Sequence, residues 1–268
     1  MDSQRTIAGI RSVGFVPTRV LGLMAILACF GMGCRQRSSI PLPQNDPNPS
    51  IEAPSTFEGT IFRDDFSGHL SPEWKWQDEE PSRYQITNDG WLEITGGDRS
   101  VLTDGQQANL LWIDLPEGDF EILLHLRSRP LFDFQQAGLL IYQDPENYLS
   151  LTRGYCMECV LGGEGVFLEF SSNGDQGRFT AAISASDLYL ILVVEQGIVS
   201  AYYAIEENQR QHLASIKNTF ILERAALSVT NDSVWDEGYD IVGSFDYFEI
   251  RRPTHFTPKP TPIFFQQA

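Results

Sequence analysis

The amino-acid sequence predicts an all-β protein whose folded part is a single antiparallel sandwich. Short apolar runs of strand length recur from about residue 57 onward, and turn-forming glycine, asparagine, aspartate and proline residues separate them. No long segment keeps the period of an amphipathic helix. Many short strands at near-regular spacing are typical of a sandwich or a barrel.

The expected strands are short and rich in β-branched, aromatic and leucine residues. They are Trp91–Thr95, Asn109–Leu115, Phe120–Leu126, Gly138–Tyr142, Tyr148–Thr152, Val166–Phe170, Tyr189–Val194, Val199–Ala204 and Phe245–Ile250. Ala182–Leu188 and Asn208–Ile216 are expected to hold a turn or two of helix. Apolar alternation places Trp74, Trp91 and Phe120 in the core.

Changes in composition set the expected domain boundaries. Residues 1–33 form a signal peptide, and residues 34–56 form a proline-rich tether that is too polar to bury a core. Residues 57–252 form the sandwich. Residues 253–268 form a second proline-rich tail, which cannot add a central strand.

The N-terminal segment has the pattern of an export signal. Arg5, Arg11 and Arg19 precede or begin an apolar run that is too short to span a bilayer comfortably. Two cysteines follow small residues, which resembles the lipobox where bacterial lipoproteins are cleaved and acylated on the new N-terminal cysteine. Cys34 follows the fuller apolar stretch and is the expected lipidation site, with Cys29 as the alternative. The expected location is therefore the cell membrane, lipid-anchored and facing the extracytoplasmic side; an uncleaved anchor or an ordinary signal peptide is the other interpretation.

Charge and cysteine content limit the possible functions. A formal charge of −17 argues against nucleic-acid binding, because contact with phosphates needs a basic face. Cys156 and Cys159 form a C-x-x-C pair without a second pair or a nearby histidine to complete a zinc site. A local disulfide or two free thiols on a hairpin is the expected state.

Six motifs, in a fixed order along the chain, resemble a known family. They are Phe62–Gly68, Pro72–Trp76, Gly90–Ile94, Gly118–Ile122, Gln136–Tyr148 and Phe245–Ile250. Together they resemble the concanavalin A-like domain at the C-terminus of family 43 β-xylosidases and in the related DUF1349 proteins, over about residues 57–251. The resemblance implies a two-sheet antiparallel jelly roll of the concanavalin A-like or laminin G-like kind, with a curved sheet that could face a glycan. It implies no active site, because in such xylosidases a separate propeller domain carries the chemistry.

One group of carboxylates has the spacing of a catalytic motif. Glu117, Asp119 and Glu121 match the E-x-D-x-E pattern of concanavalin-like glucanases, in which alternate residues of a strand share one face. However, Pro116 and Gly118 indicate a turn, and carboxylates four residues apart must lean together to reach the roughly 5 Å of a retaining mechanism. We expect no catalytic residues, and a glycoside hydrolase is the less favoured hypothesis.

No cofactor and no metal ion is expected. The four histidines are scattered without metal-ligand spacing. Asp64, Asp65 and Asp246 lie in the first and last strand motifs, which could be neighbours in a sandwich. They could hold a structural calcium ion through their oxygen atoms.

Aromatic and amide side chains give the stronger indication of function. Sugar rings stack on Trp and Tyr, while Asn, Gln and Asp satisfy their hydroxyl groups. The candidate ligand-binding residues are Trp76, Trp112, Tyr142, Gln143, Asp144, Asn147 and Tyr148. The leading hypothesis is a surface-displayed, non-catalytic module that binds a polysaccharide or cell-wall glycan. The alternative is a scaffold lipoprotein that contacts another envelope protein.

Overall fold

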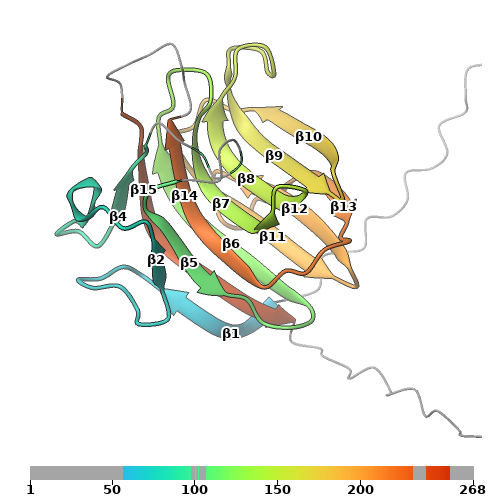
Figure 1. Cartoon of the computed structure of the whole chain (residues 1–268), viewed down its shortest axis with the longest axis horizontal. Helices are drawn as coiled ribbons and strands as arrows, with labels where there is room; N and C mark the ends of the chain where they lie inside the picture. Colours follow the sequence, from blue (N-terminus) through green and yellow to red (C-terminus); the bar gives the residue numbers. More distant parts are fainter. Residues whose placement is uncertain (1–56, 98–99, 101, 103–106, 232–239, 254–268) are drawn as a thin grey trace, which may run out of the picture. The chain divides into compact units, whose positions relative to one another are not determined.

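The structure is a computed structural model that describes residues 57–97, 100, 102, 107–231 and 240–253. Two antiparallel sheets pack face to face in a concanavalin A-like sandwich, which confirms the predicted fold class (Figure 1). The predicted signal peptide, the predicted tether, Cys29, Cys34 and the predicted tail beyond Pro253 lie outside the described residues. Within those residues, no helix has the length and apolar character needed to cross a bilayer.

In the part of the chain that the structure describes, the two sheets contain fifteen strands, eight in sheet A and seven in sheet B. Sheet A has the order β13-β12-β11-β6-β15-β4-β3, with β1 also paired to β15, and sheet B has the order β10-β9-β8-β7-β14-β5-β2. The strands of sheet A are β1 (Phe57–Asp64), β3 (Tyr84–Ile86), β4 (Leu92–Thr95), β6 (Phe120–Ser128), β11 (Asp187–Glu195), β12 (Ile198–Ala204), β13 (Gln211–Lys217) and β15 (Val242–Pro253). The strands of sheet B are β2 (Lys75–Gln77), β5 (Leu110–Asp114), β7 (Gln135–Asp144), β8 (Asn147–Tyr155), β9 (Glu164–Ser172), β10 (Asp175–Ala182) and β14 (Arg224–Asn231). One short 3₁₀ helix, Pro81–Arg83, precedes β3.

The core lies between the sheets because alternate residues of each strand point inward. On β6 the inward residues are Ile122, Leu124 and Leu126, and all three are fully buried. Phe120 and Trp74 also belong to this core, as the sequence predicted.

Three sequence-based expectations were wrong. Ala182–Leu188 contains no helix, because β10 ends at Ala182 and β11 begins at Asp187. Trp91 precedes β4 and is only partly buried, and the strand's inward residues are Leu92 and Ile94 instead. Asn208–Ile216 contains no helix, because most of it forms the edge strand β13, which pairs with β12.

Gly138 marks a close approach between neighbouring strands of sheet B. A Cβ atom at this position would collide with the carbonyl oxygen of Leu151 and would come within 2.9 Å of Thr152 Cα and Leu190 Cδ1. Backbone atoms cannot move aside as a flexible side chain can, so only glycine fits here.

The first and last strands of the described domain are direct neighbours. Phe57 of β1 lies opposite Pro253 of β15, and the pairing continues to Asp64 and Phe248. In Figure 1, the blue β1 runs beside the red β15. The domain's entry and exit points therefore lie at the same end of the sandwich.

Candidate functional site

The outward-facing side chains of sheet B form the surface that brings together several of the predicted residues. We call this surface the sheet B face. Strand register places one row of its residues side by side, in the order Trp112, Ala226, Leu140, Ser150, Glu169 and Arg178. The middle of the row is small or aliphatic and is buried, whereas aromatic and charged side chains stand at its two ends.

Tyr142 and Tyr148 lie directly opposite each other on β7 and β8, so their side chains share the sheet B face. Both are partly buried. Burial, followed by the nearby charge of Asp144, raises the pKa of the Tyr142 phenol; burial, followed by Glu169, raises the pKa of the Tyr148 phenol. Both phenols therefore remain protonated and can donate hydrogen bonds at neutral pH.

Arg224 stands beside this tyrosine pair. It lies one residue before Ala225, whose register partner is Ile141, so it is level with Tyr142 on the neighbouring strand. Its guanidinium carbon lies 4.2 Å from the ring centroid of Trp112. Trp112 is only 3% exposed, and its Nε1 donates a hydrogen bond to Gln77 Oε1 (3.0 Å). Trp112 thus supports Arg224 and is not itself an open stacking surface.

The other predicted polar residues shape the turns beside the tyrosines. Asp144 accepts hydrogen bonds from the Glu146 backbone N–H (2.9 Å) and from Asn147 Nδ2 (3.0 Å). Asn147 Oδ1 accepts from the Asn173 backbone N–H, and Gln143 Oε1 accepts from the Ile221 backbone N–H. These contacts join the β7–β8, β9–β10 and β13–β14 loops at one end of the sheet B strands.

Trp76 is separated from the other predicted residues. It pairs in register with the inward-facing Leu111, packs against the main core and stacks on Tyr84 with ring centroids 4.3 Å apart. The Trp76 side chain therefore packs against the core on the inner side of sheet B and does not contribute to the sheet B face.

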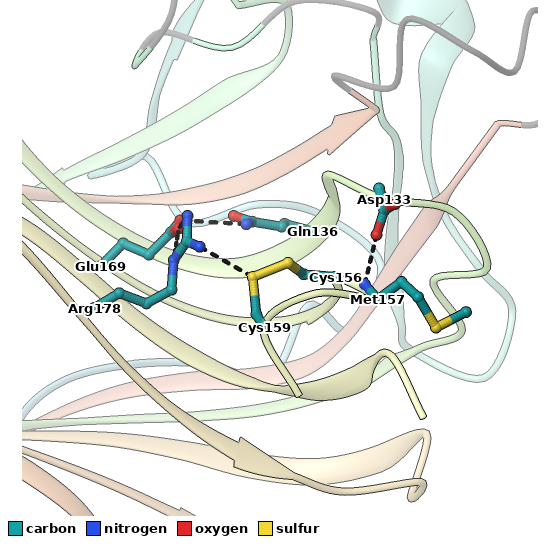
Figure 2. The surroundings of a disulfide bond; sticks show 7 residues. All are labelled: Asp133, Gln136, Cys156, Met157, Cys159, Glu169 and Arg178. Atoms are coloured by element: carbon teal, nitrogen blue, oxygen red, sulfur yellow. Dashed lines mark hydrogen bonds and ion pairs between the residues drawn. A yellow bond between two sulfur atoms is a disulfide. The ribbon is translucent and has the colours of Figure 1, made fainter. Parts of the chain in front are cut away.

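The far end of the sheet B face is linked to a disulfide loop (Figure 2). Cys156 and Cys159 are joined by a disulfide, with their Cα atoms 5.2 Å apart. Arg178 donates hydrogen bonds to Cys159 Sγ (3.0 Å) and to Glu169 Oε1 (2.6 Å). Glu169 Oε2 also accepts a hydrogen bond from Gln136 Nε2 (3.2 Å). Arg178 thereby connects the loop to the outward side chains of β7 and β9.

Exposed apolar side chains gather on the same loop and on the β6–β7 connection. Met157 is 57% exposed and Leu161 is 96% exposed. The Met157 backbone N–H donates to Asp133 Oδ1, which joins the two connections, and Phe134 on the β6–β7 connection is also exposed. Together these residues form an apolar surface at the end of β6 opposite to the domain's entry and exit.

The outward face of sheet A carries a second cluster that sequence reasoning missed. The two ring nitrogens of His125 lie 2.8 Å from Asp246 Oδ2 and 2.8 Å from Asp187 Oδ1. The His125 ring stacks on Tyr189 with centroids 4.3 Å apart, and Trp91 packs at its side. These residues come from different strands and are separated by long stretches of sequence, so no local spacing could reveal the cluster. The ring nitrogens of His125 and the carboxylates of Asp187 and Asp246 are thus hydrogen-bonded to one another.

The E-x-D-x-E carboxylates have three separate environments. Glu117 is exposed in the β5–β6 turn, and Asp119 Oδ1 accepts a hydrogen bond from the Gln196 backbone N–H (2.9 Å). Glu121 has no exposed surface; both of its oxygens accept hydrogen bonds from Arg210, one at 3.0 Å, and Arg251 lies 3.8 Å away. Glu121 therefore takes part in an ion-pair network on sheet A.

A groove of about 500 Å³ lies among β1, β2, β5 and β15, and its lining includes Ile61, Phe62 and Ile113. Two carboxylates line it. Asp114 forms an ion pair with Lys75 (2.7 Å), and the pKa of Glu73 is lowered by a hydrogen bond from the Ser71 hydroxyl. A general acid needs a raised pKa, so Glu73 is poorly suited to that role.

The acidic residues considered for calcium contact separate partners. Asp64 accepts hydrogen bonds from the Phe66 backbone N–H (2.8 Å) and from Trp74 Nε1 (2.9 Å). Asp65 pairs with Arg63 (2.6 Å), and Asp246 contacts His125. In the part of the chain that the structure describes, no group of three or more potential ligands could hold a metal ion.

Comparison with known proteins agrees with this architecture. Residues 63–230 match the family described as "Beta xylosidase C-terminal Concanavalin A-like domain". No curated protein sequence matches the chain. A GH43 protein of Bacillus licheniformis is 18% identical with a TM-score of 0.63, and the match covers 70% of this chain and 39% of that one.

Two further solved structures have the same fold. The xylan β-1,4-xylosidase of Bacillus halodurans C-125 is 19% identical with a TM-score of 0.61, covering 75% of this chain and 41% of that one. The β-glucanase of Bacillus licheniformis is 9% identical with a TM-score of 0.54, covering 73% of this chain and 99% of that one. At these identities the likeness concerns the fold alone. The chain spans only 39% and 41% of the lengths of the two GH43-type structures it resembles.

Proposed function

The chain belongs to the family of β-xylosidase C-terminal concanavalin A-like domains, and from this premise we propose that it is a non-catalytic module that binds a polysaccharide or cell-wall glycan. The ligand would lie on the sheet B face, across the tyrosine pair of β7 and β8.

The opposed phenols of Tyr142 and Tyr148 are the observation that carries this proposal. They give a sugar two adjacent rings to contact and two protonated hydroxyl groups that can donate hydrogen bonds. Hydrogen bonds within the chain fix the neighbouring turns, so little loop ordering would be needed on binding.

Alanine substitution of Tyr142 or Tyr148 is expected to weaken glycan binding about tenfold, because each removes stacking area and a hydroxyl donor. The full chain, solubilised in mild detergent, would be screened on a glycan array and then titrated with the best ligand. Tyr202→Ala is the matched control, since Tyr202 is a partly buried tyrosine on the outward side of sheet A.

Equal losses for the Tyr202 variant and the two sheet B variants would contradict this placement of the site. Failure to bind any glycan would contradict the function itself. The apolar surface around Met157 and Leu161 would then favour the second candidate, a scaffold that contacts another envelope protein.

We also propose that a lipid on the first residue of the mature chain fixes the module to the extracytoplasmic side of the cell membrane. Intact mass of the membrane-extracted protein is expected to show a diacylglycerol-sized increment on Cys34, and Cys34→Ser should remove it. An increment on Cys29 would move the site to the alternative cysteine. An unmodified mature N-terminus would refute the lipid anchor.

A further inference from the structure

We propose that the ligand of the sheet B face carries carboxylate groups, as in a uronic-acid-containing glycan, and that Arg224 binds the carboxylate. This proposal rests on the proposed function and names the chemical class of ligand for the same site.

Arg224 differs from most of the other arginines of the described domain. Arg127, Arg178 and Arg210 each form an ion pair with a carboxylate. Arg224 is exposed and has no ion pair with any residue that the structure describes, although the chain contains 36 acidic and 19 basic residues. Its register neighbour Asp114 pairs with Lys75 instead. The positive charge of Arg224 is therefore available to an external anion.

The position of Arg224 is fixed before any ligand arrives. Its guanidinium lies over the Trp112 ring, and Trp112 is buried and held by Gln77. Among the described residues, no hydrogen-bond acceptor occupies the N–H edge of the guanidinium. That edge matches the two oxygens of a carboxylate, which a lysine ammonium cannot do.

Tyr142, one member of the tyrosine pair, lies on the strand next to that of Arg224. Neighbouring strands are about 4.8 Å apart, and Arg224 is level with Tyr142 on adjacent strands. A pyranose in contact with Tyr142 could therefore direct a carboxylate substituent toward the guanidinium. The net negative charge of the chain opposes acidic polymers at long range, but salt screens that repulsion beyond about 8 Å at physiological ionic strength.

The test compares polygalacturonate with the same polymer after chemical reduction of its carboxyl groups, at 0.15 M salt and with the full chain. The unsubstituted protein is expected to bind the acidic polymer at least about tenfold more tightly than the reduced one. Arg224→Met, which retains the apolar stem, should abolish this preference by weakening binding to the acidic polymer to about the level of the reduced one. Arg129→Met is the control, because Arg129 is also exposed and has no ion pair with a described residue. Thermal melting of each variant verifies that it is folded.

Equal affinity of the unsubstituted protein for the two polymers would overturn the proposal, as would a preference that survives in Arg224→Met. If Tyr142→Ala weakens binding to both polymers while Arg224→Met leaves their ratio unchanged, the proposed function stands and this inference fails. Absence of binding to every glycan would overturn both.

Discussion

Replacing Gly138 by alanine is expected to lower the free energy of unfolding by about 3 kcal/mol. The added methyl group would meet the Leu151 carbonyl oxygen and the Thr152 Cα atom of the adjoining strand, as well as Leu190 across the core. Strands β7 and β8 must separate to relieve these contacts, which would weaken their hydrogen-bond ladder. Urea denaturation followed by tryptophan fluorescence would measure the loss.

Gly97→Ala is the matched control for this substitution. Among the described residues, a Cβ atom at Gly97 would have no neighbour within 4 Å, so stability should change by less than about 0.5 kcal/mol. Equal stabilities of the Gly138 and Gly97 variants would mean that the strands near Gly138 can relax, contrary to the close approach described above.

Glu121→Gln is expected to destabilise the domain by about 3 kcal/mol, because it removes the charge of a buried carboxylate that pairs with Arg210 and lies near Arg251. Arg210 loses a bidentate contact, and Arg251 loses a nearby negative charge. An amide also presents N–H donors where only an acceptor is suitable. Chemical denaturation at neutral pH would measure the effect.

Glu117→Gln provides the comparison within the same E-x-D-x-E pattern. Glu117 is exposed in a turn, so its substitution should change stability by less than about 0.5 kcal/mol. Assays on laminarin, lichenan and xylan would distinguish a structural from a catalytic role. Turnover that Glu121→Gln abolishes in a folded protein would refute the non-catalytic interpretation.

The central strands of the fold were predictable because they contain apolar runs of leucine, β-branched and aromatic residues. β6, β7, β11 and β12 each contain such a run. β14 was not predicted, although it is central in sheet B, because Ala225, Ala226 and Ser228 have weak strand preferences. Small side chains are required there, since β14 is almost entirely buried.

The candidate site was only partly predictable. Tyr142 and Tyr148 flank a recognisable turn, so a hairpin that brings them together follows from the sequence. Trp76 and Trp112 look alike in sequence, yet register points one toward the core and the other outward. Arg224 gave no signal, because its lack of an ion-pair partner depends on contacts between distant strands.

The sequence-based prediction also misplaced Trp91. The alternation of Leu92 and Ile94 already assigns their neighbours to the opposite face, so the correct orientation was present in the pattern. The prediction was wrong because it assumed that a residue as large and aromatic as Trp91 is buried in the core. Instead, the Arg127 guanidinium lies 4.4 Å from its ring centroid and covers it from solvent on the outward side of sheet A.

The pairing of β1 with β15 places the two ends of the domain side by side, which suits the domain to insertion into another protein. Because residues 57 and 253 are register partners, a host protein could accept the sandwich within a single surface loop while its own chain is displaced very little. Two copies could equally be joined in tandem by short connections. Evolution could thus transfer this sandwich between proteins of different architecture without redesigning its core.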